Sequence, residues 1–225
     1  MTRVVFDSST LISLSSSCLL NATGHMFADL GLKGVIPSGV VAESISTPMK
    51  YKRLELSAVR IQNGIEEGWI ETMELDKKGR QEARNVMFLA NNCFEGSRGP
   101  LTLLHLGEVE ALVLANCIGA KLIGIDERTT RMIIEEPQKL AKLLSKRLHH
   151  DVSLNKQYSN ELIEKFADIN FIRSTELVAL AAEKGYLVDE IGTGKKALEA
   201  ALYAVKFMGC AVGSQEIEGF LGAKK

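Results

Sequence analysis

Short apolar runs alternate with longer amphipathic segments over the first two thirds of the chain. Each apolar run is rich in Val, Ile or Trp and ends at an acid or a turn residue, which predicts buried strands at 3–7, 34–37, 69–75 and 121–125. Helical spacing of the apolar residues predicts helices at 11–20, after Pro37, and at 51–62, 78–92, 107–117 and 127–134. This alternation predicts an α/β fold with a Rossmann-like parallel sheet flanked by helices.

The last third of the chain has a different pattern. After a short expected strand at 150–154, helical periodicity recurs in residues 159–167, 175–184, 195–208 and 215–221. We therefore expect a first domain over residues 1–155 and a helical C-terminal extension over residues 156–225. The apolar faces of that extension are expected to pack either against the first domain or across a dimer.

Composition narrows the class of protein. Of 225 residues, 46% are hydrophobic and 24% are charged, and the net charge of −1 excludes a strongly basic protein that coats nucleic acid. The four cysteines form no Cys-x-x-Cys pair, which argues against a zinc site or a disulfide framework and favours a reducing cytoplasm. No apolar run approaches the ~18 residues of a membrane helix, and the residues before Asp7 do not form a signal-peptide core.

Acidic residues stand where the predicted strands and helices meet. Asp7 and Asp126 directly follow strands, Glu43 lies about one helical turn beyond the second strand, and Glu108 and Glu110 open the helix before the fourth strand. The carboxyl ends of parallel strands meet at one edge of a sheet, where ligands bind. Carboxylates gathered there repel one another unless they bind hard cations such as Mg²⁺ or Mn²⁺.

Each acid taken alone has a simpler interpretation. An Asp that follows a strand is most often a helix N-cap, and a single Glu at the position of Glu43 is most often a solvated helix residue. Glu108 and Glu110 could simply favour the positive end of a helix dipole. The metal-site hypothesis therefore depends on the joint placement of these acids.

Three segments carry a specific resemblance. VVFDSSTLI, VIPSGVVAESI and LGEVEALVLANCIGAKLIGIDERTTR together span residues 3–131, and in this order they resemble PIN-domain proteins, the ribonucleases and toxin–antitoxin toxins of bacteria and archaea. The resemblance implies a Rossmann-like sheet with a cluster of acids that holds Mg²⁺ or Mn²⁺ at its carboxyl edge. Matched by position, the catalytic and metal-binding acids are Asp7, Glu43, Glu110 and Asp126.

Neighbouring residues take supporting roles in this interpretation. Ser9 and Thr10 resemble the polar residues that accompany the first family acid. Glu108 and Glu110 are two positions apart, about 200° on a helical wheel, so both cannot point into one pocket. Glu110 is preferred because it matches the family acid, and Glu108 is left to serve a second metal or to cap its helix. Arg128 and Arg131, which follow Asp126, are expected to contact RNA phosphate, and an ion pair with one of the acids is the equal alternative for Arg131.

The resemblance implies a metal-dependent phosphodiesterase, an endoribonuclease acting on single-stranded RNA with an activated water. No covalent intermediate is required, so no Ser or Cys nucleophile is expected. The alternative is a catalytically silent PIN fold that binds RNA or an assembly partner through its helical extension. An antitoxin partner and a homodimer are further expectations from the resemblance, and the choice between RNA and DNA stays open.

Overall fold

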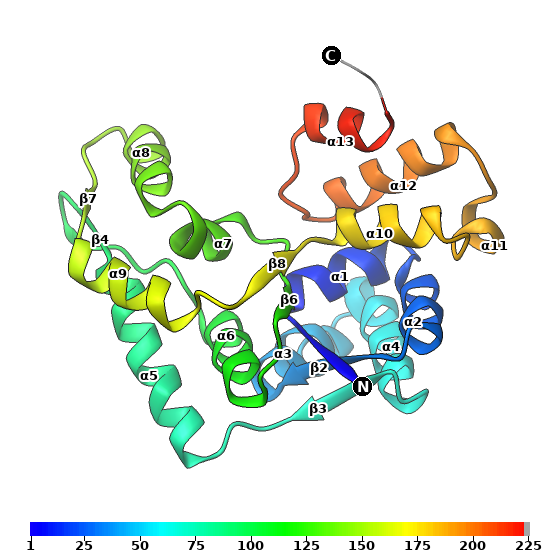
Figure 1. The fold of residues 1–225 in the computed structure, drawn as a ribbon, viewed down its shortest axis with the longest axis horizontal. Coiled ribbons are helices and arrows are strands. Elements are labelled where there is room, and N and C mark those ends of the chain that lie inside the picture. The colour runs from blue at the N-terminus through cyan, green and yellow to red at the C-terminus, as the bar shows by residue number, and fades with distance from the viewer. Residues whose placement is uncertain (223–225) are drawn as a thin grey trace.

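A computed structural model describes residues 1–222 of the protein, and its centre is a five-stranded parallel sheet (Figure 1). The strand order is β3-β2-β1-β6-β8, and every neighbouring pair is parallel. The strands are β1 Thr2–Phe6, β2 Leu32–Pro37, β3 Ile70–Met73, β6 Leu122–Gly124 and β8 Asn170–Ile172. The expected α/β architecture with a Rossmann-like parallel sheet is confirmed, and all five carboxyl ends lie along one edge.

Side chains alternate between the two faces of the sheet because successive residues of a strand point to opposite sides. On β1, Val4 and Phe6 pack into one buried cluster and Val5 into the other; Val35 and Ile36 on β2 divide in the same way. Helices cover both faces, as a parallel sheet requires. The helices of the first half are α1 Ser8–Ser16, α2 Leu20–Asp29, α3 Ser38–Val41, α4 Lys52–Glu66 and α5 Lys77–Asn92, with a π-helix at Ala42–Ser46 and a 3-10 turn at Pro48–Lys50.

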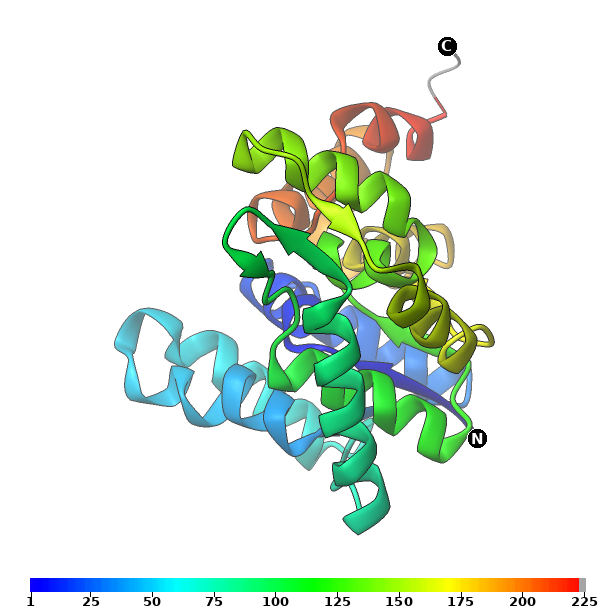
Figure 2. The ribbon, with the colours of Figure 1, turned by 90° about the vertical axis from the view of Figure 1, so that its left-hand side faces the viewer.

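The second half of the chain adds helices to both faces. They are α6 Leu106–Ile118, α7 Arg128–Glu135, α8 Pro137–Leu148, α9 Lys156–Lys165, α10 Ser174–Glu183, α11 Val188–Ile191, α12 Lys195–Phe207 and α13 Ser214–Phe220. In Figures 1 and 2, α5, α8 and α9 lie to one side of the sheet and α10–α13 to the other. No helix within residues 1–222 is long and apolar enough to cross a bilayer.

The segment beyond residue 155 contributes to the central core. β8 pairs with β6, with Ile123 opposite Phe171. Leu177 and Leu202 are buried in the same cluster as Phe6 of β1. Of the two packing partners expected for the extension, the structure thus provides the first domain. The sequence did not predict β8, because a three-residue strand is too short for a periodic signal.

Three local differences from the expected elements have simple causes. The first helix ends at Ser16, because Cys18 has a positive φ of 61°, and a separate helix begins at Leu20. Pro137 begins α8, a helix that the sequence did not predict, and proline fits its first turn. Residues 93–100, for which the sequence predicted no strand, contain a hairpin of β4 Phe94–Gly96 and β5 Gly99–Pro100. The expected last strand is β7 Ser153–Leu154, which pairs with β4 outside the main sheet.

Candidate functional site

Asp7 and Asp126 lie side by side at the carboxyl edge of the sheet, where Ser9 joins them. β1 ends at Phe6 and β6 at Gly124, and these neighbouring strands bring the two acids together. The Ser9 hydroxyl lies 2.5 Å from Asp7 Oδ2 and accepts the Asp126 backbone N–H at 3.0 Å. Ser9 thus fixes the position of Asp7 relative to the turn after β6.

The two carboxylate oxygens of Asp7 have different surroundings. Oδ2 accepts the backbone N–H of Ser9 at 3.0 Å, so Asp7 is the N-cap of α1, as the simpler interpretation held. Oδ1 is buried and has no hydrogen-bond partner, although Asp7 is only 1% exposed. Burial raises the Asp7 pKa to about 6; the Ser9 hydrogen bonds oppose this rise and the charge of Glu108 adds to it. The role of N-cap therefore accounts for the position of Oδ2 but not for the burial of Oδ1.

The Asp126 carboxylate is occupied on both oxygens. Oδ1 accepts the Ser174 backbone N–H at 2.7 Å and the Thr10 hydroxyl at 3.4 Å, and Oδ2 accepts the Ser174 hydroxyl at 2.7 Å. Ser174 is the first residue of α10, so Asp126 binds the N-terminus of a helix that lies far along the chain. The sequence could not show this contact, because β8, which places Ser174, gave no signal.

Glu43 and Glu110 lie near the N-termini of α1 and α3. Glu43, in the π-helix, is exposed and accepts the Ser8 hydroxyl at 2.8 Å. Glu110 Oε2 accepts the backbone N–H of Gly39 at 2.7 Å. A Cβ at Gly107 would lie 2.7 Å from both carboxylate oxygens of Glu43, so the absent side chain leaves the space that this carboxylate occupies.

Glu108 points away from Glu110 and toward α7. Its Oε2 accepts the backbone N–H of His105 at 2.7 Å, which caps α6, and its Oε1 accepts the Thr130 hydroxyl at 2.6 Å. Burial raises the pKa of Glu108, and the nearby charge of Glu127 adds to that rise. The Thr130 hydroxyl also lies 3.2 Å from Glu127 Oε2, so one hydroxyl stands between two carboxylates.

Glu127 is a member of this cluster that the sequence reasoning missed. It follows Asp126 directly, and only the Asp of the Ile-Asp-Glu-Arg segment was singled out. Glu127 Oε2 accepts the Thr130 backbone N–H at 2.8 Å and caps α7. The available signal was its place one residue before a helix that also carries Thr130.

Arg131 is buried but forms no ion pair with any of the acids in residues 1–222. Its guanidinium group donates to the backbone carbonyls of Ile125 at 3.1 Å and Ala211 at 3.4 Å. The expected ion pair with an acid of the site is therefore wrong, because the guanidinium group instead contacts backbone carbonyls after β6 and in the C-terminal segment. The expected phosphate contact stays a prediction.

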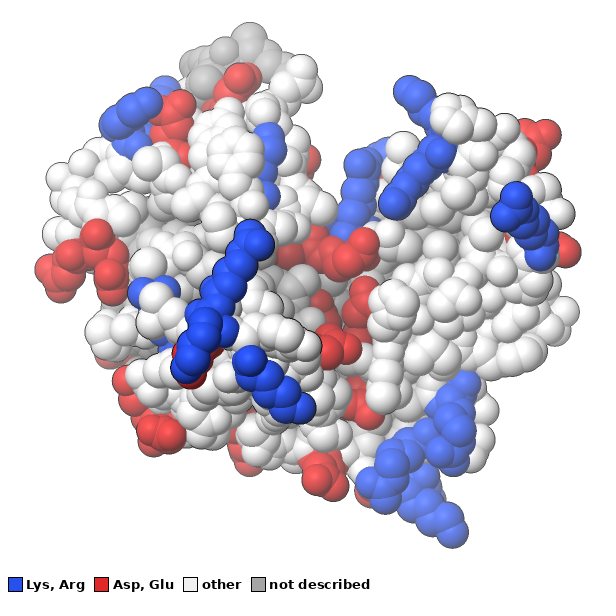
Figure 3. Space-filling view, turned by 180° about the vertical axis from the view of Figure 1, so that it is seen from behind, with Lys and Arg blue, Asp and Glu red and all other residues white. Residues whose placement is uncertain are grey.

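The carboxylate oxygens at this edge meet some of the requirements of a Mg²⁺ or Mn²⁺ site. Asp7 Oδ1 is a buried anionic oxygen without a donor, which is what a hard cation would satisfy. Within the described residues, however, no three His, Cys, Asp or Glu side chains are arranged to enclose an ion. Mg²⁺ needs no such enclosure, because it keeps several waters and is often held by one or two carboxylates and substrate phosphates. Figure 3 shows acidic side chains grouped in a central hollow, with basic side chains on the surrounding surface.

A comparison with protein families covers the part of the chain that carries the acids of this edge. A family model described as a PIN domain matches residues 3–138, which include all the acids of the site. Neither the curated proteins nor the solved structures give a match to this chain.

Proposed function

Because this chain belongs to the PIN-domain family, we propose that it is a Mg²⁺- or Mn²⁺-dependent endoribonuclease that cleaves single-stranded RNA. PIN domains are typically nucleases, and they generally use divalent metals. The observation that carries the proposal is the unpartnered, buried Oδ1 of Asp7. Burying a charged oxygen without a donor destabilises the fold, and a bound cation offsets that penalty.

The proposed ion-binding acids are Asp7, Glu43, Glu110 and Asp126. Asp7 offers Oδ1. Glu43 and Glu110 each use one oxygen for a hydrogen bond, to Ser8 and Gly39, and offer the other. Asp126 has the least to offer, since three donors already occupy its oxygens. When bound, the ion would make water more acidic and neutralise charge on the phosphoryl oxygens.

The supporting residues orient these carboxylates. Ser9 binds Asp7 Oδ2 and leaves Oδ1 without a hydrogen bond, while Thr10 helps to fix Asp126. Glu108 is close enough to Asp7 to raise its pKa, and a cation between them would relieve the repulsion. Hydrolysis by water at phosphorus requires no covalent bond to the protein, so the residues of the site only bind, orient and hold protons.

Cleavage of a labelled single-stranded RNA with Mn²⁺ tests the proposal. Asp7→Asn keeps the shape of the side chain and removes its charge, and we expect activity to fall by at least 100-fold, on the order of the effect of one electrostatic group at an active site. Asp151→Asn, an exposed Asp in a loop, is the matched control and should keep full activity. Equal cleavage by Asp7→Asn and wild type would overturn the assignment.

A second function is favoured by the engagement of Glu110 and Asp126 with backbone N–H groups. These contacts fit a silent PIN fold that binds RNA or an assembly partner. Thermal melting with Mn²⁺ separates the two functions, since an ion that binds only the folded state raises the melting temperature. We expect a shift for the nuclease and none for the silent protein. With the nuclease function we also propose a cytoplasmic location, an antitoxin partner and a homodimer.

A further inference from the structure

A cavity of about 710 Å³ lies beside the acidic site, between α7 and α8 on one side and α10 and α13 on the other. Phe171 of β8 lines it, as does the backbone from Ala211 to Gly213. In Figure 1, α7 and α8 face α13 across this region, with β8 passing between them. Neither the four proposed ion-binding acids nor Glu108 lines this cavity.

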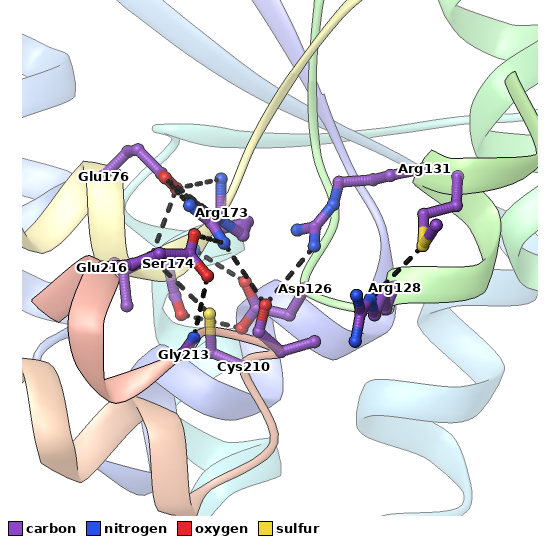
Figure 4. A network of polar contacts seen from close by, with 12 residues as sticks. Asp126, Arg128, Arg131, Arg173, Ser174, Glu176, Cys210, Gly213 and Glu216 are labelled. Atoms are coloured by element: carbon purple, nitrogen blue, oxygen red, sulfur yellow. Dashed lines mark hydrogen bonds and ion pairs between the residues drawn. The ribbon is translucent and has the colours of Figure 1, made fainter. Parts of the chain in front are cut away.

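Most of the charges that line the cavity are already paired. Glu136 binds Lys139 at 3.0 Å, and Arg173 binds Glu216 at 2.8 Å and Glu176 at 2.9 Å. Figure 4 shows Glu176 and Glu216 gathered around Arg173, with Arg128 and Arg131 on the other side of Asp126. Three of the four lining acids thus have a cationic partner, Glu136 in Lys139 and both Glu176 and Glu216 in Arg173.

On the α7 side of the cavity, beside Glu135 and Glu136, two guanidinium groups have no ion-pair partner in the described part of the chain. Arg131 is 9% exposed, and within residues 1–222 neither it nor Arg128 forms an ion pair. Arg128 is exposed and has one contact, from Nε to the Met132 sulfur at 3.3 Å. The remaining lining acid, Glu135, is exposed and acts on the charge of Arg131 from beyond ion-pair distance.

Arg131 also lies close to a second cation. Its Nη2 donates to the Ala211 carbonyl at 3.4 Å, and Arg173 Nη1 donates to the same oxygen at 3.3 Å. Two guanidinium groups therefore converge on one neutral acceptor, and of these two only that of Arg173 forms ion pairs. A guanidinium has five N–H donors, and backbone carbonyls take only two of those of Arg131. A buried cation with unused donors that lines a cavity calls for an oxyanion.

We propose that this cavity binds a phosphate group through Arg128 and Arg131, and that the phosphate belongs to the RNA strand held at the acidic site. Phosphate fits because its oxygens match the planar fork of donors that arginine presents. The partly exposed Phe171 provides a flat apolar surface against which an adjoining base can stack.

The strand is assigned from the position of α7 between the two sites. Thr130 binds Glu108 in the acidic cluster, while the next residue, Arg131, lines the cavity. A strand that passes the N-terminal part of α7 can therefore contact both. This assignment to the RNA strand rests on the proposed nuclease function. Binding of a free nucleotide in the cavity would not depend on that function.

Binding of labelled single-stranded RNA in EDTA tests the proposal without cleavage. Arg128→Gln removes an exposed cation, and we expect weaker binding at low salt and a salt slope of log Kd that is smaller by about 0.7, the value for one lost phosphate contact with a single strand. Arg84→Gln on α5 is the control with the same change of charge at an exposed position far from the cavity lining, and its slope should equal that of wild type. Arg131→Lys, which keeps the charge and loses the fork, should weaken binding while keeping the slope.

The source of the phosphate is resolved by a second arm with 5′-AMP and inorganic phosphate. If 5′-AMP raises the melting temperature of wild type and not of Arg128→Gln, while RNA binding is the same in both, the site binds free nucleotides and its assignment to the strand is wrong. If Arg128→Gln and Arg84→Gln behave alike in both arms, the cavity is no phosphate site. Because the assays need neither metal nor cleavage, a protein without nuclease activity can still pass them.

Discussion

Replacing Asp7 by Asn should greatly lower activity and at the same time stabilise the metal-free protein. Asn keeps an oxygen that accepts the Ser9 hydrogen bonds and removes the buried charge. A carboxyl group whose pKa is raised on folding, here from 3.8 to about 6, favours the protonated folded state. The stability of wild type therefore falls as pH rises from about 4 to about 6, and the full penalty is present above that range.

The size of the effect follows from the pKa. The rise to about 6 corresponds to about 3 kcal/mol of unfolding free energy at pH 8. This pKa already includes the favourable backbone hydrogen bonds at the N-terminus of α1, so we expect Asp7→Asn to be more stable by about 3 kcal/mol at pH 8. Below pH 4 the two proteins should be about equally stable, because Asp7 is then neutral.

Urea unfolding in EDTA at pH 4, 6 and 8 measures this difference. Asp151→Asn, in an exposed loop, should follow wild type at every pH. An Asp7→Asn protein that is no more stable than wild type at pH 8 would contradict the reasoning. In that case Asp7 would be a helix cap whose buried oxygen carries no electrostatic penalty, and the main support for an ion at this position would be lost.

Two further predictions concern the neighbours of Asp7. Ser174→Ala removes the hydroxyl that donates to Asp126 Oδ2, and we expect it to lower the unfolding free energy by about 1.5–3 kcal/mol, the range for a hydrogen bond to a charged group. Urea unfolding measures this change, with the exposed Ser97→Ala as the control that should match wild type. A Ser174→Ala protein as stable as wild type would contradict the role of this contact. Gly107→Ala places a methyl group 2.7 Å from the Glu43 carboxylate; since Glu43 is exposed and can move, we expect Mn²⁺ affinity to fall by about tenfold, or about 1.4 kcal/mol, with little loss of stability. Gly219→Ala, whose added methyl meets nothing within 4 Å, should leave titrated Mn²⁺ affinity unchanged, and equal affinities in the two variants would refute the role given to Gly107.

The parallel sheet was predictable because its central strands are buried on both faces and read as short apolar runs. β1, β2, β3 and β6 were all expected, and the acids after β1 and β6 were expected at one edge. β8 was not, since three residues that pair through backbone atoms leave almost no pattern in the side chains. That one strand determines where α10 begins, and so the missed strand concealed the partner of Asp126.

The sequence predicted which acids belong to the site better than it predicted the contacts that each acid makes. Spacing on α6 indicated that Glu108 and Glu110 diverge, and in the structure they contact α7 and α3 respectively. Which oxygens stay free depends on donors from distant segments, such as Gly39 for Glu110 and Ser174 for Asp126. A single sequence does not contain those contacts. The buried Oδ1 of Asp7 is likewise a property of packing and not of spacing.

Calorimetric titration of the metal-free protein with Mn²⁺ tests most directly whether Asp7 binds the ion. We expect wild type and Asp151→Asn to bind Mn²⁺ with equal affinity, and Asp7→Asn to bind at least tenfold more weakly, about 1.4 kcal/mol or more. The greater stability expected for Asp7→Asn ensures that such a loss does not come from unfolding. Equal Mn²⁺ affinity in wild type and Asp7→Asn, or no binding to wild type, would contradict the account.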